Sequence, residues 1–188
     1  MKNIIIEIKK NEEKIVPFIY LARDVDKKII VRLLGEGASV HIIGIFIGKK
    51  NNLFNFQTQV IHEAPHSKSK TTIRAVLINN SAFNNDGLIH VMKGAKGADG
   101  YFASKILLFD NAKGKSIPSL EIDENDLKAG HASTVGKPDQ DQIFYLQSKG
   151  LSKKEAEKLI VSGFFQPVIG SLPINQQKKI TKQIAQLL

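Results

Sequence analysis

The stretch from Leu53 to Leu77, LFNFQTQVIHEAPHSKSKTTIRAVL, contains two runs in which apolar and polar residues alternate. In the first run the alternate positions that share one face are Phe54, Phe56, Thr58 and Val60, and those between them are Asn55, Gln57, Gln59 and Ile61. The second run repeats this spacing at Ile73, Ala75 and Leu77. A period of two residues predicts β-strands that each bury one face.

The same pattern extends outward from this stretch, over about residues 1–127. Short runs rich in Ile, Val, Phe and Leu are separated there by clusters of Gly, Asn, Asp and Lys. No helical pattern of ten or more residues interrupts them, which argues against alternating strand and helix units. The remaining choices are an all-β sandwich, a barrel or a solenoid.

A weak internal repeat, which we call the alanine echo, favours the solenoid. Apolar residues are followed four positions later by alanine, a small residue that suits a tight corner, in the pairs Leu34/Ala38, Val60/Ala64, Ile78/Ala82, Val91/Ala95 and Leu108/Ala112. The steps between these alanines are irregular, so the echo does not identify a solenoid by itself.

The pattern becomes helical after Lys137 and Pro138. Residues 139–149 predict one helix, and Ser152 with Glu155 forms a capping box that predicts the start of a second. The apolar face expected for this second helix is Ala156, Leu159, Ile160 and Phe164. After an interruption at Pro167, Gly170 and Pro173, Asn175 is expected to cap a third helix, whose stripe is Ile180, Ile184, Leu187 and Leu188. We therefore expect a strand domain over residues 1–137 and a small helical domain over residues 138–188.

Composition excludes several classes of function. The chain has no cysteine, so it offers no disulfide, no thiolate nucleophile and no thiolate metal ligand. Its net charge of +9 comes from lysines that are scattered in pairs, without the basic stripe and interleaved aromatics of a nucleic-acid binder. The apolar run in the N-terminal MKNIIIEIKK is only three residues long, which is too short for a signal peptide or a membrane span. We expect a cytoplasmic protein without a membrane partner.

The segment from Leu107 to Phe164 carries specific motifs. They are PSLEI at 118–122, HASTVG at 131–136, DQIFYL at 141–146, SKG at 148–150, and Glu155 with Ala156. In order and spacing they resemble the C-terminal signature of the SufB/SufD family of iron-sulfur cluster assembly subunits. Weaker correspondences reach upstream through Asp99, Val91, Ile89, Gly87 and Phe83 to His62. The resemblance covers about residues 55–165.

This resemblance implies a right-handed parallel β-helix followed by a small α-helical domain. It also implies a non-catalytic subunit that dimerises through the β-helix, with a second copy or a SufB-like chain. Family members use their C-terminal helices to dock a SufC-like ABC-type ATPase. The residues that we expect at this docking surface are Gln142, Phe144, Tyr145, Glu155 and Phe164. The same aromatic side chains could instead pack on the β-helix.

His131 is the candidate metal ligand, because it matches a family histidine that is placed at the interface between SufB and SufD. Neutral imidazole is a competent iron ligand, although a structural histidine at a turn into Ser133 is the alternative. Cysteine or glutamate often occurs near this position in the family, where the chain has Ala129 and Ala132, and a SufB-like cysteine would fall near Ala112. A short, cysteine-free, SufD-like member is therefore implied. We expect no stably bound cofactor, only transient iron or an iron-sulfur cluster shared with a partner.

The other histidines and the carboxylates suggest no catalytic site. His62 and His66 are four residues apart, but Pro65 opposes a helix there, so we expect turn-stabilising or solvated histidines rather than a zinc pair. The acidic cluster at residues 123–126 predicts a turn beside a strand. Two other classes of function remain as alternatives: a carbohydrate-active β-helix protein and a basic nucleic-acid-binding module.

Overall fold

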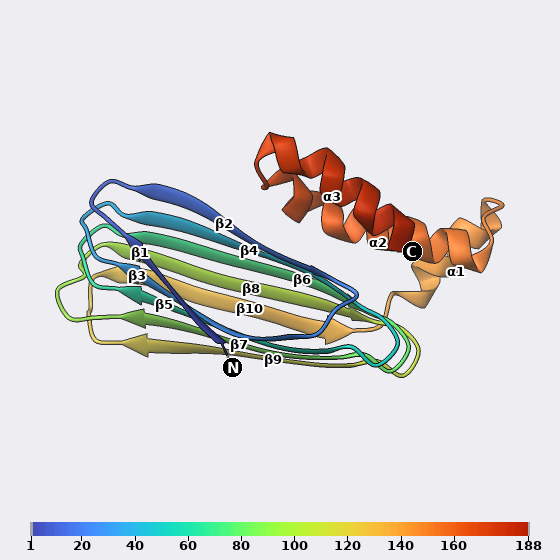
Figure 1. The fold of residues 1–188 in the computed structure, drawn as a ribbon, viewed down its shortest axis with the longest axis horizontal. Helices are drawn as coiled ribbons and strands as arrows, with labels where there is room; N and C mark the ends of the chain where they lie inside the picture. Colours follow the sequence, from blue (N-terminus) through green and yellow to red (C-terminus); the bar gives the residue numbers. More distant parts are fainter. Residues whose placement is uncertain (1, 188) are drawn as a thin grey trace.

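The computed structural model describes residues 2–187, which form ten β-strands followed by three α-helices (Figure 1). The strands are β1 (Lys2–Ile8), β2 (Glu13–Leu21), β3 (Val25–Leu33), β4 (Ser39–Gly48), β5 (Leu53–His62), β6 (Lys68–Leu77), β7 (Ala82–Val91), β8 (Ala98–Leu108), β9 (Lys113–Ile122) and β10 (Leu127–Gly136). The helices are α1 (Gln140–Ser148), α2 (Lys153–Gly170) and α3 (Ile174–Leu187). Strand structure thus continues to Gly136, beyond the alternating pattern that extends to about residue 127 and within the strand domain expected over residues 1–137.

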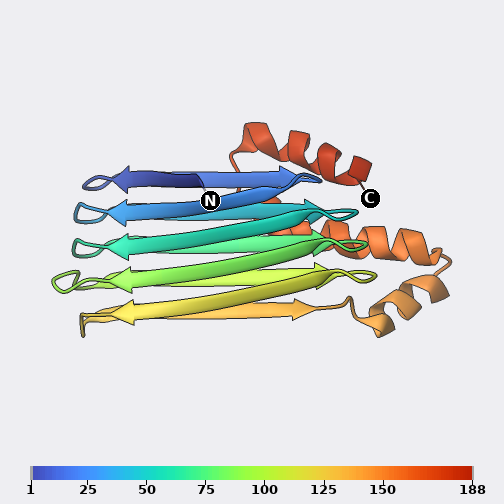
Figure 2. The same ribbon diagram turned by 60° about the horizontal axis from the view of Figure 1, so that its bottom comes forward.

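The strands form two parallel sheets that face each other. One sheet has the order β1-β3-β5-β7-β9 and the other β10-β8-β6-β4-β2, so each odd strand and the next even strand complete one turn of a solenoid (Figure 2). Ile29 pairs with Thr58, 29 positions later, and Ala82 pairs with Lys113, 31 positions later. The predicted fold class, a parallel β-helix followed by a small helical domain, is confirmed, and the solenoid has about five turns.

The corners of the solenoid are set by two columns of residues with left-handed backbone. At one end of the strands these residues are Asn11, Gly37, His66 and Gly97, and at the other end Ala22, Lys50, Asn79 and Asp110. The column residues also bond from turn to turn, because the amide of Asn79 donates to Asp110 Oδ2 and the amide of Lys50 to Asn79 Oδ1. The residues of the alanine echo lie in or beside the same corners.

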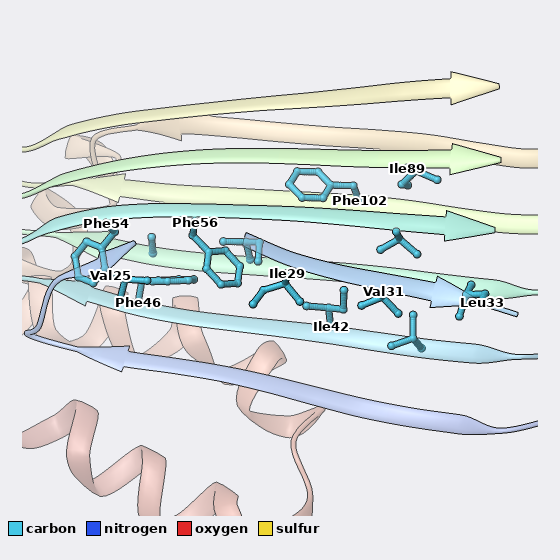
Figure 3. Packing of buried hydrophobic residues seen from close by; sticks show 14 of the residues in the cluster. Val25, Ile29, Val31, Leu33, Ile42, Phe46, Phe54, Phe56, Ile89 and Phe102 are labelled. Atoms are coloured by element: carbon cyan, nitrogen blue, oxygen red, sulfur yellow. The ribbon is translucent and has the colours of Figure 1, made fainter. Parts of the chain in front are cut away.

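Apolar side chains fill the space between the two sheets (Figure 3). The face predicted from the alternation in β5, with Phe54, Phe56, Thr58 and Val60, is buried. The rings of Phe46 and Phe83 lie 4.6 Å apart between their centroids, and Phe46 also contacts Phe56 edge-on. Offset and edge-on ring pairs add to the burial energy of this core.

A second core joins the helices to the outside of one sheet. In β4 the run from Val40 to Ile47 is apolar on both faces except at His41 and Gly44. Its outward-facing side chains must therefore also be shielded from water by other parts of the chain. The side chains in this second core are Ile43, Ile45, Ile47, Val76, Val161, Phe165, Val168, Ile169, Leu172, Ile180 and Ile184. Helix α2 therefore packs against β4 and β6, and α3 packs against α2 and completes this core.

Two expectations about the helices were wrong. Pro167 does not end α2, which continues to Gly170, because the turn that follows this proline buries Val168 and Ile169 in the second core. Helix α3 begins at Ile174, so Asn175 lies inside its first turn rather than at its cap. Ile180 and Ile184 are buried as expected, whereas Leu188 lies outside the described residues.

The apolar face predicted for α2 was only partly right. Ala156 is buried, but Leu159 is exposed and Ile160 and Phe164 are half-buried. The buried stripe runs instead through Val161 and Phe165, because that side faces the outer isoleucines of β4. None of the helices within residues 2–187 is long and apolar enough to cross a lipid bilayer.

Candidate functional site

The last turn of the solenoid is open. Strand β9 ends one sheet and β10 ends the other, so each has one side without a neighbouring strand (Figure 2). Leu120 and Ile122 pair with buried residues of β7, and Val135 pairs with buried Ile106, so these side chains point into the solenoid. They are nevertheless 36%, 43% and 38% exposed, because no further strand covers them. The open end therefore combines unpaired backbone edges with exposed core residues.

His131 belongs to this open end. It pairs with Phe102, a core residue of β8, and so occupies an inward-facing position of β10. Its side chain is exposed, and within residues 2–187 it forms no hydrogen bond or ion pair. The same residues contain no group of three metal-ligating side chains from His, Cys, Asp or Glu. His131 is therefore available at the end of the solenoid but is not part of a preassembled metal site.

A second exposed apolar surface lies on α1 and the adjoining part of α2, at the end of the molecule that projects beyond the strands (Figure 1). Phe144 and Tyr145 are 73% and 60% exposed, and Leu159 is also exposed. A shallow groove runs beside them, lined by Asp141, Gln142, Tyr145, Leu146, Leu159 and Ile160. We call Gln142, Phe144, Tyr145, Leu159 and Ile160 the helical face.

The structure separates the five predicted docking residues into two groups. Gln142, Phe144 and Tyr145 are exposed together on α1. Glu155 is exposed, but its Oε2 accepts hydrogen bonds from the amide and the hydroxyl of Ser152, at 2.8 and 2.6 Å, in the capping box. These bonds lower the pKa of the Glu155 carboxyl below its usual value. Phe164 packs against the second core, with the guanidinium of Arg74 5.0 Å from its ring centroid.

His62 is fully buried inside the solenoid, and both of its ring nitrogens have serine partners, unlike those of a zinc ligand. Its Nδ1 and Nε2 each lie 2.8 Å from a serine hydroxyl, of Ser67 and Ser69 respectively. The Ser67 hydroxyl donates to the carbonyl of Ala64, so Ser67 must accept from Nδ1, and the neutral ring accepts at Nε2 from Ser69. Burial lowers the pKa of His62 to about 4. His62 thus fixes the corner after β5 as a neutral side chain.

The remaining histidines do not form a metal site either. His66 is an exposed corner residue with left-handed backbone, so it shares no site with His62. His90 Nε2 lies 2.9 Å from Asp123 Oδ2, and His41 Nε2 lies 3.1 Å from the hydroxyl of Thr72. Residues 123–126 form the connection between β9 and β10, where they were expected to form a turn.

Comparison with known proteins identifies the family. Residues 15–164 match the family model described as "SUF system FeS cluster assembly, SufBD core domain". This match spans most of the solenoid, α1 and part of α2. The chain belongs to the SufB/SufD family.

Individual SufB/SufD proteins support the assignment. Over 148 residues the chain is 35% identical to the iron-sulfur cluster assembly protein SufD of Bacillus subtilis. The aligned region covers 78% of the chain and 34% of that protein. SufBD family proteins of Staphylococcus epidermidis and Staphylococcus haemolyticus are each 30% identical over 153 residues, covering 81% of the chain and 33% of each relative. The chain thus spans about a third of the length of these relatives.

The exposed core residues of the last turn were not singled out from the sequence as candidate site residues. Leu120, Ile122 and Val135 lie within the PSLEI and HASTVG motifs that carry the SufB/SufD resemblance. Their alternation looks like that of any buried strand, and only the end of the solenoid exposes them. The signal that could have identified them is that two of the most specific motifs fall on the last two strands.

Proposed function

We propose that this chain is a non-catalytic, SufD-like subunit of an iron-sulfur cluster assembly complex. In this proposal it pairs through the open end of its solenoid and docks an ABC-type ATPase through its helical face. The observation that carries the proposal is the last turn, where two unpaired strand edges flank exposed core residues in a SufB/SufD chain. Edge strands with apolar side chains favour pairing with another chain, and soluble proteins usually protect them.

The partner at the open end is either a SufB-like subunit or a second copy. Both would present a complementary last turn, so strand edges and apolar side chains would be covered at once. Obligate interfaces resemble a domain core that has been cut in two, and Leu120, Ile122 and Val135 continue the core of this chain outward. Pairing would also bring His131 of this chain close to residues of the partner.

At that junction His131 would contribute one ligand to iron or to a nascent cluster, which is the cargo of the complex rather than a resident cofactor. Iron-sulfur clusters are held mainly by thiolates, and the chain has none. The partner must therefore supply the sulfur ligands. This division of ligands accounts for an exposed histidine at the open end without a metal-binding group around it.

The helical face is the proposed ATPase site. Aromatic residues are enriched at the energetic centres of protein interfaces, and Phe144 and Tyr145 are the most exposed aromatic side chains of the described residues. Docking on α1 and α2 would transmit the movement of the ATPase through the second core to β4 and β6. Phe164, packed against the second core, and Glu155, bonded to Ser152 in the capping box, would support this face rather than contact the ATPase.

Binding of a purified SufC-like ABC-type ATPase tests the proposal. Calorimetry should show binding to the chain, and Tyr145→Glu should weaken it at least tenfold because a charge would be desolvated at the interface centre. Ile174→Glu is the matched control, since Ile174 is exposed on α3, away from this face. The proposal fails if no SufC-like ATPase binds and the chain also remains a monomer, alone and with a SufB-like subunit.

A further inference from the structure

A cleft of about 520 Å³ separates the corners of the solenoid from the start of the helical segment. One wall consists of the turns after β4, β6 and β8, which contribute Lys49, Asn79 and Asp110. The other wall consists of the connection after β10 and the first half of α2. This cleft is distinct from the open end, and it shares no lining residue with the groove on the helical face.

The cleft is strongly cationic. Five lysines line it, namely Lys49, Lys137, Lys153, Lys154 and Lys158, against two carboxylates, Asp110 and Glu157. Both carboxylates have partners: Glu157 lies 3.9 Å from the ammonium of Lys153, and Asp110 accepts hydrogen bonds from the amide and side chain of Asn79 at 2.8 and 3.1 Å.

Three of the lysines lack a partner. Within the described part of the chain, the ammonium groups of Lys49, Lys137 and Lys154 form no ion pair and no hydrogen bond. Lys49 is also half-buried, which makes an uncompensated charge costlier than on an open surface. Three lysines whose ammonium groups lack carboxylate partners therefore line one concave site.

The start of α2 adds to this positive potential. The amides of Lys153 and Lys154 precede the first hydrogen bond within the helix, which runs from Ala156 to Ser152. The capping box satisfies the amides of Ser152 and Glu155 and leaves those two free. Free amides and the positive end of a helix dipole both favour an anion.

The floor of the cleft is apolar. Its partly exposed apolar residues are Ile78, Leu108 and Phe109, and the buried side chains of Pro138, Ile143 and Val161 lie behind them. Small-molecule sites of 300–1,000 Å³ commonly combine such a floor with a few convergent charged groups. A simple anion would leave the floor uncovered, whereas a ligand with phosphates and a ring or other apolar part would use both halves.

We propose that this cleft binds a small phosphorylated ligand, whose phosphates lie among Lys49, Lys137 and Lys154 and whose apolar part covers Ile78 and Phe109. The ligand would bridge the solenoid and α2, so binding would stabilise their packing. The site goes beyond the assembly role proposed above, and it involves neither the open end nor the helical face.

Calorimetric titration of the full chain with ATP, inorganic pyrophosphate and adenosine tests the site. Saturable binding of ATP is expected, with pyrophosphate weaker because it lacks the ring, and adenosine weaker still because it lacks phosphate. Lys49→Gln with Lys154→Gln should weaken ATP binding about tenfold or more, since two charge-assisted contacts are lost. Higher salt should weaken binding as well, because part of the cleft is exposed.

The control removes the same charge elsewhere. Lys115→Gln with Lys178→Gln changes two exposed lysines that do not line the cleft, and it should leave ATP binding within about twofold, because surface charges outside the site are screened by salt. Circular dichroism would verify that both double variants are folded. Absence of binding by all three probes would overturn the proposal. Equal weakening in both variants, or binding of a poly-glutamate peptide but not of ATP or pyrophosphate, would also overturn it.

Discussion

The ring of Phe102 lies directly against the backbone of Gly87, across the interior of the solenoid. A Cβ atom added to Gly87 would lie 2.1 Å from Cε2 of Phe102, and two further ring atoms would be within 2.5 Å. Phe102 is almost fully buried in β8, so its ring has little space to move. Gly87 is therefore required for packing.

Gly87→Ala should destabilise the fold by about 3 kcal/mol, because overpacking in a closed core forces side chains or backbone to shift. Urea unfolding of the variant would measure the loss. Adding Phe102→Leu should recover part of it, since the smaller side chain leaves room for the new methyl group. Gly136→Ala is the control, because nothing lies within 4 Å of a Cβ there and its stability should change little. Equal effects of the two glycine substitutions would contradict the packing explanation.

Ala22→Gly should stabilise the chain by about 1 kcal/mol. Ala22 has a φ of 52° at a solenoid corner, a conformation that costs an L-residue with a side chain about 1–2 kcal/mol and glycine almost nothing. The midpoint of urea unfolding should therefore rise. Ala103→Gly, within β8, should lower it, because glycine loses more conformational freedom in a strand. A lower midpoint for Ala22→Gly would show that the corner is not strained.

The strands could be predicted from the sequence because alternation is a local property. The order of the strands could not, since it depends on pairs of residues about 30 positions apart, such as Ile29 and Thr58. The alanine echo was irregular because it mixes corners at both ends of the strands, as Ala64 and Ala82 illustrate. The corner columns repeat in backbone conformation but not in residue type, with His66 between two glycines, so they leave no visible repeat.

The buried side of α2 could not be predicted for a related reason. Leu159 and Phe165 are both apolar, and the helix alone does not determine which one faces the solenoid. The decision depends on the outer isoleucines of β4, such as Ile45, which belong to a distant part of the chain. The same distance explains why the cationic cleft was not foreseen: Lys49 and Lys154 are brought together only by the packing of α2 on the sheet.

Lowering the pH should destabilise the fold through His62. Its pKa falls from 6.5 to about 4 on folding, so between these values the unfolded chain binds a proton that the folded chain does not. Stability is therefore retained above pH 6.5 and decreases as the pH falls toward 4, by about 3 kcal/mol from this residue. Urea unfolding at pH 7.5, 5.5 and 4.5 would measure the decrease.

The substitution His62→Gln tests the cause, because glutamine can bond to the two serines without titrating. The variant should be less stable than the unsubstituted chain at pH 7.5, and its stability should depend less on pH. His66→Gln, at an exposed histidine of the same corner, should keep the original pH dependence. If both variants keep it, the acid sensitivity does not come from His62.

The open end of the solenoid makes the most direct prediction about assembly. Sedimentation velocity should show that the chain pairs, either with itself or with a SufB-like subunit. Ile122→Lys should weaken this pairing at least tenfold, because it places an unpaired charge where an exposed core residue would otherwise be covered. Ile5→Lys is the matched control, since Ile5 is an exposed isoleucine of β1, the strand farthest from β9 in the same sheet. Thermal unfolding of both variants would separate a lost interface from a lost fold. Unchanged pairing of Ile122→Lys, or equal weakening by Ile5→Lys, would show that the last turn is not the interface.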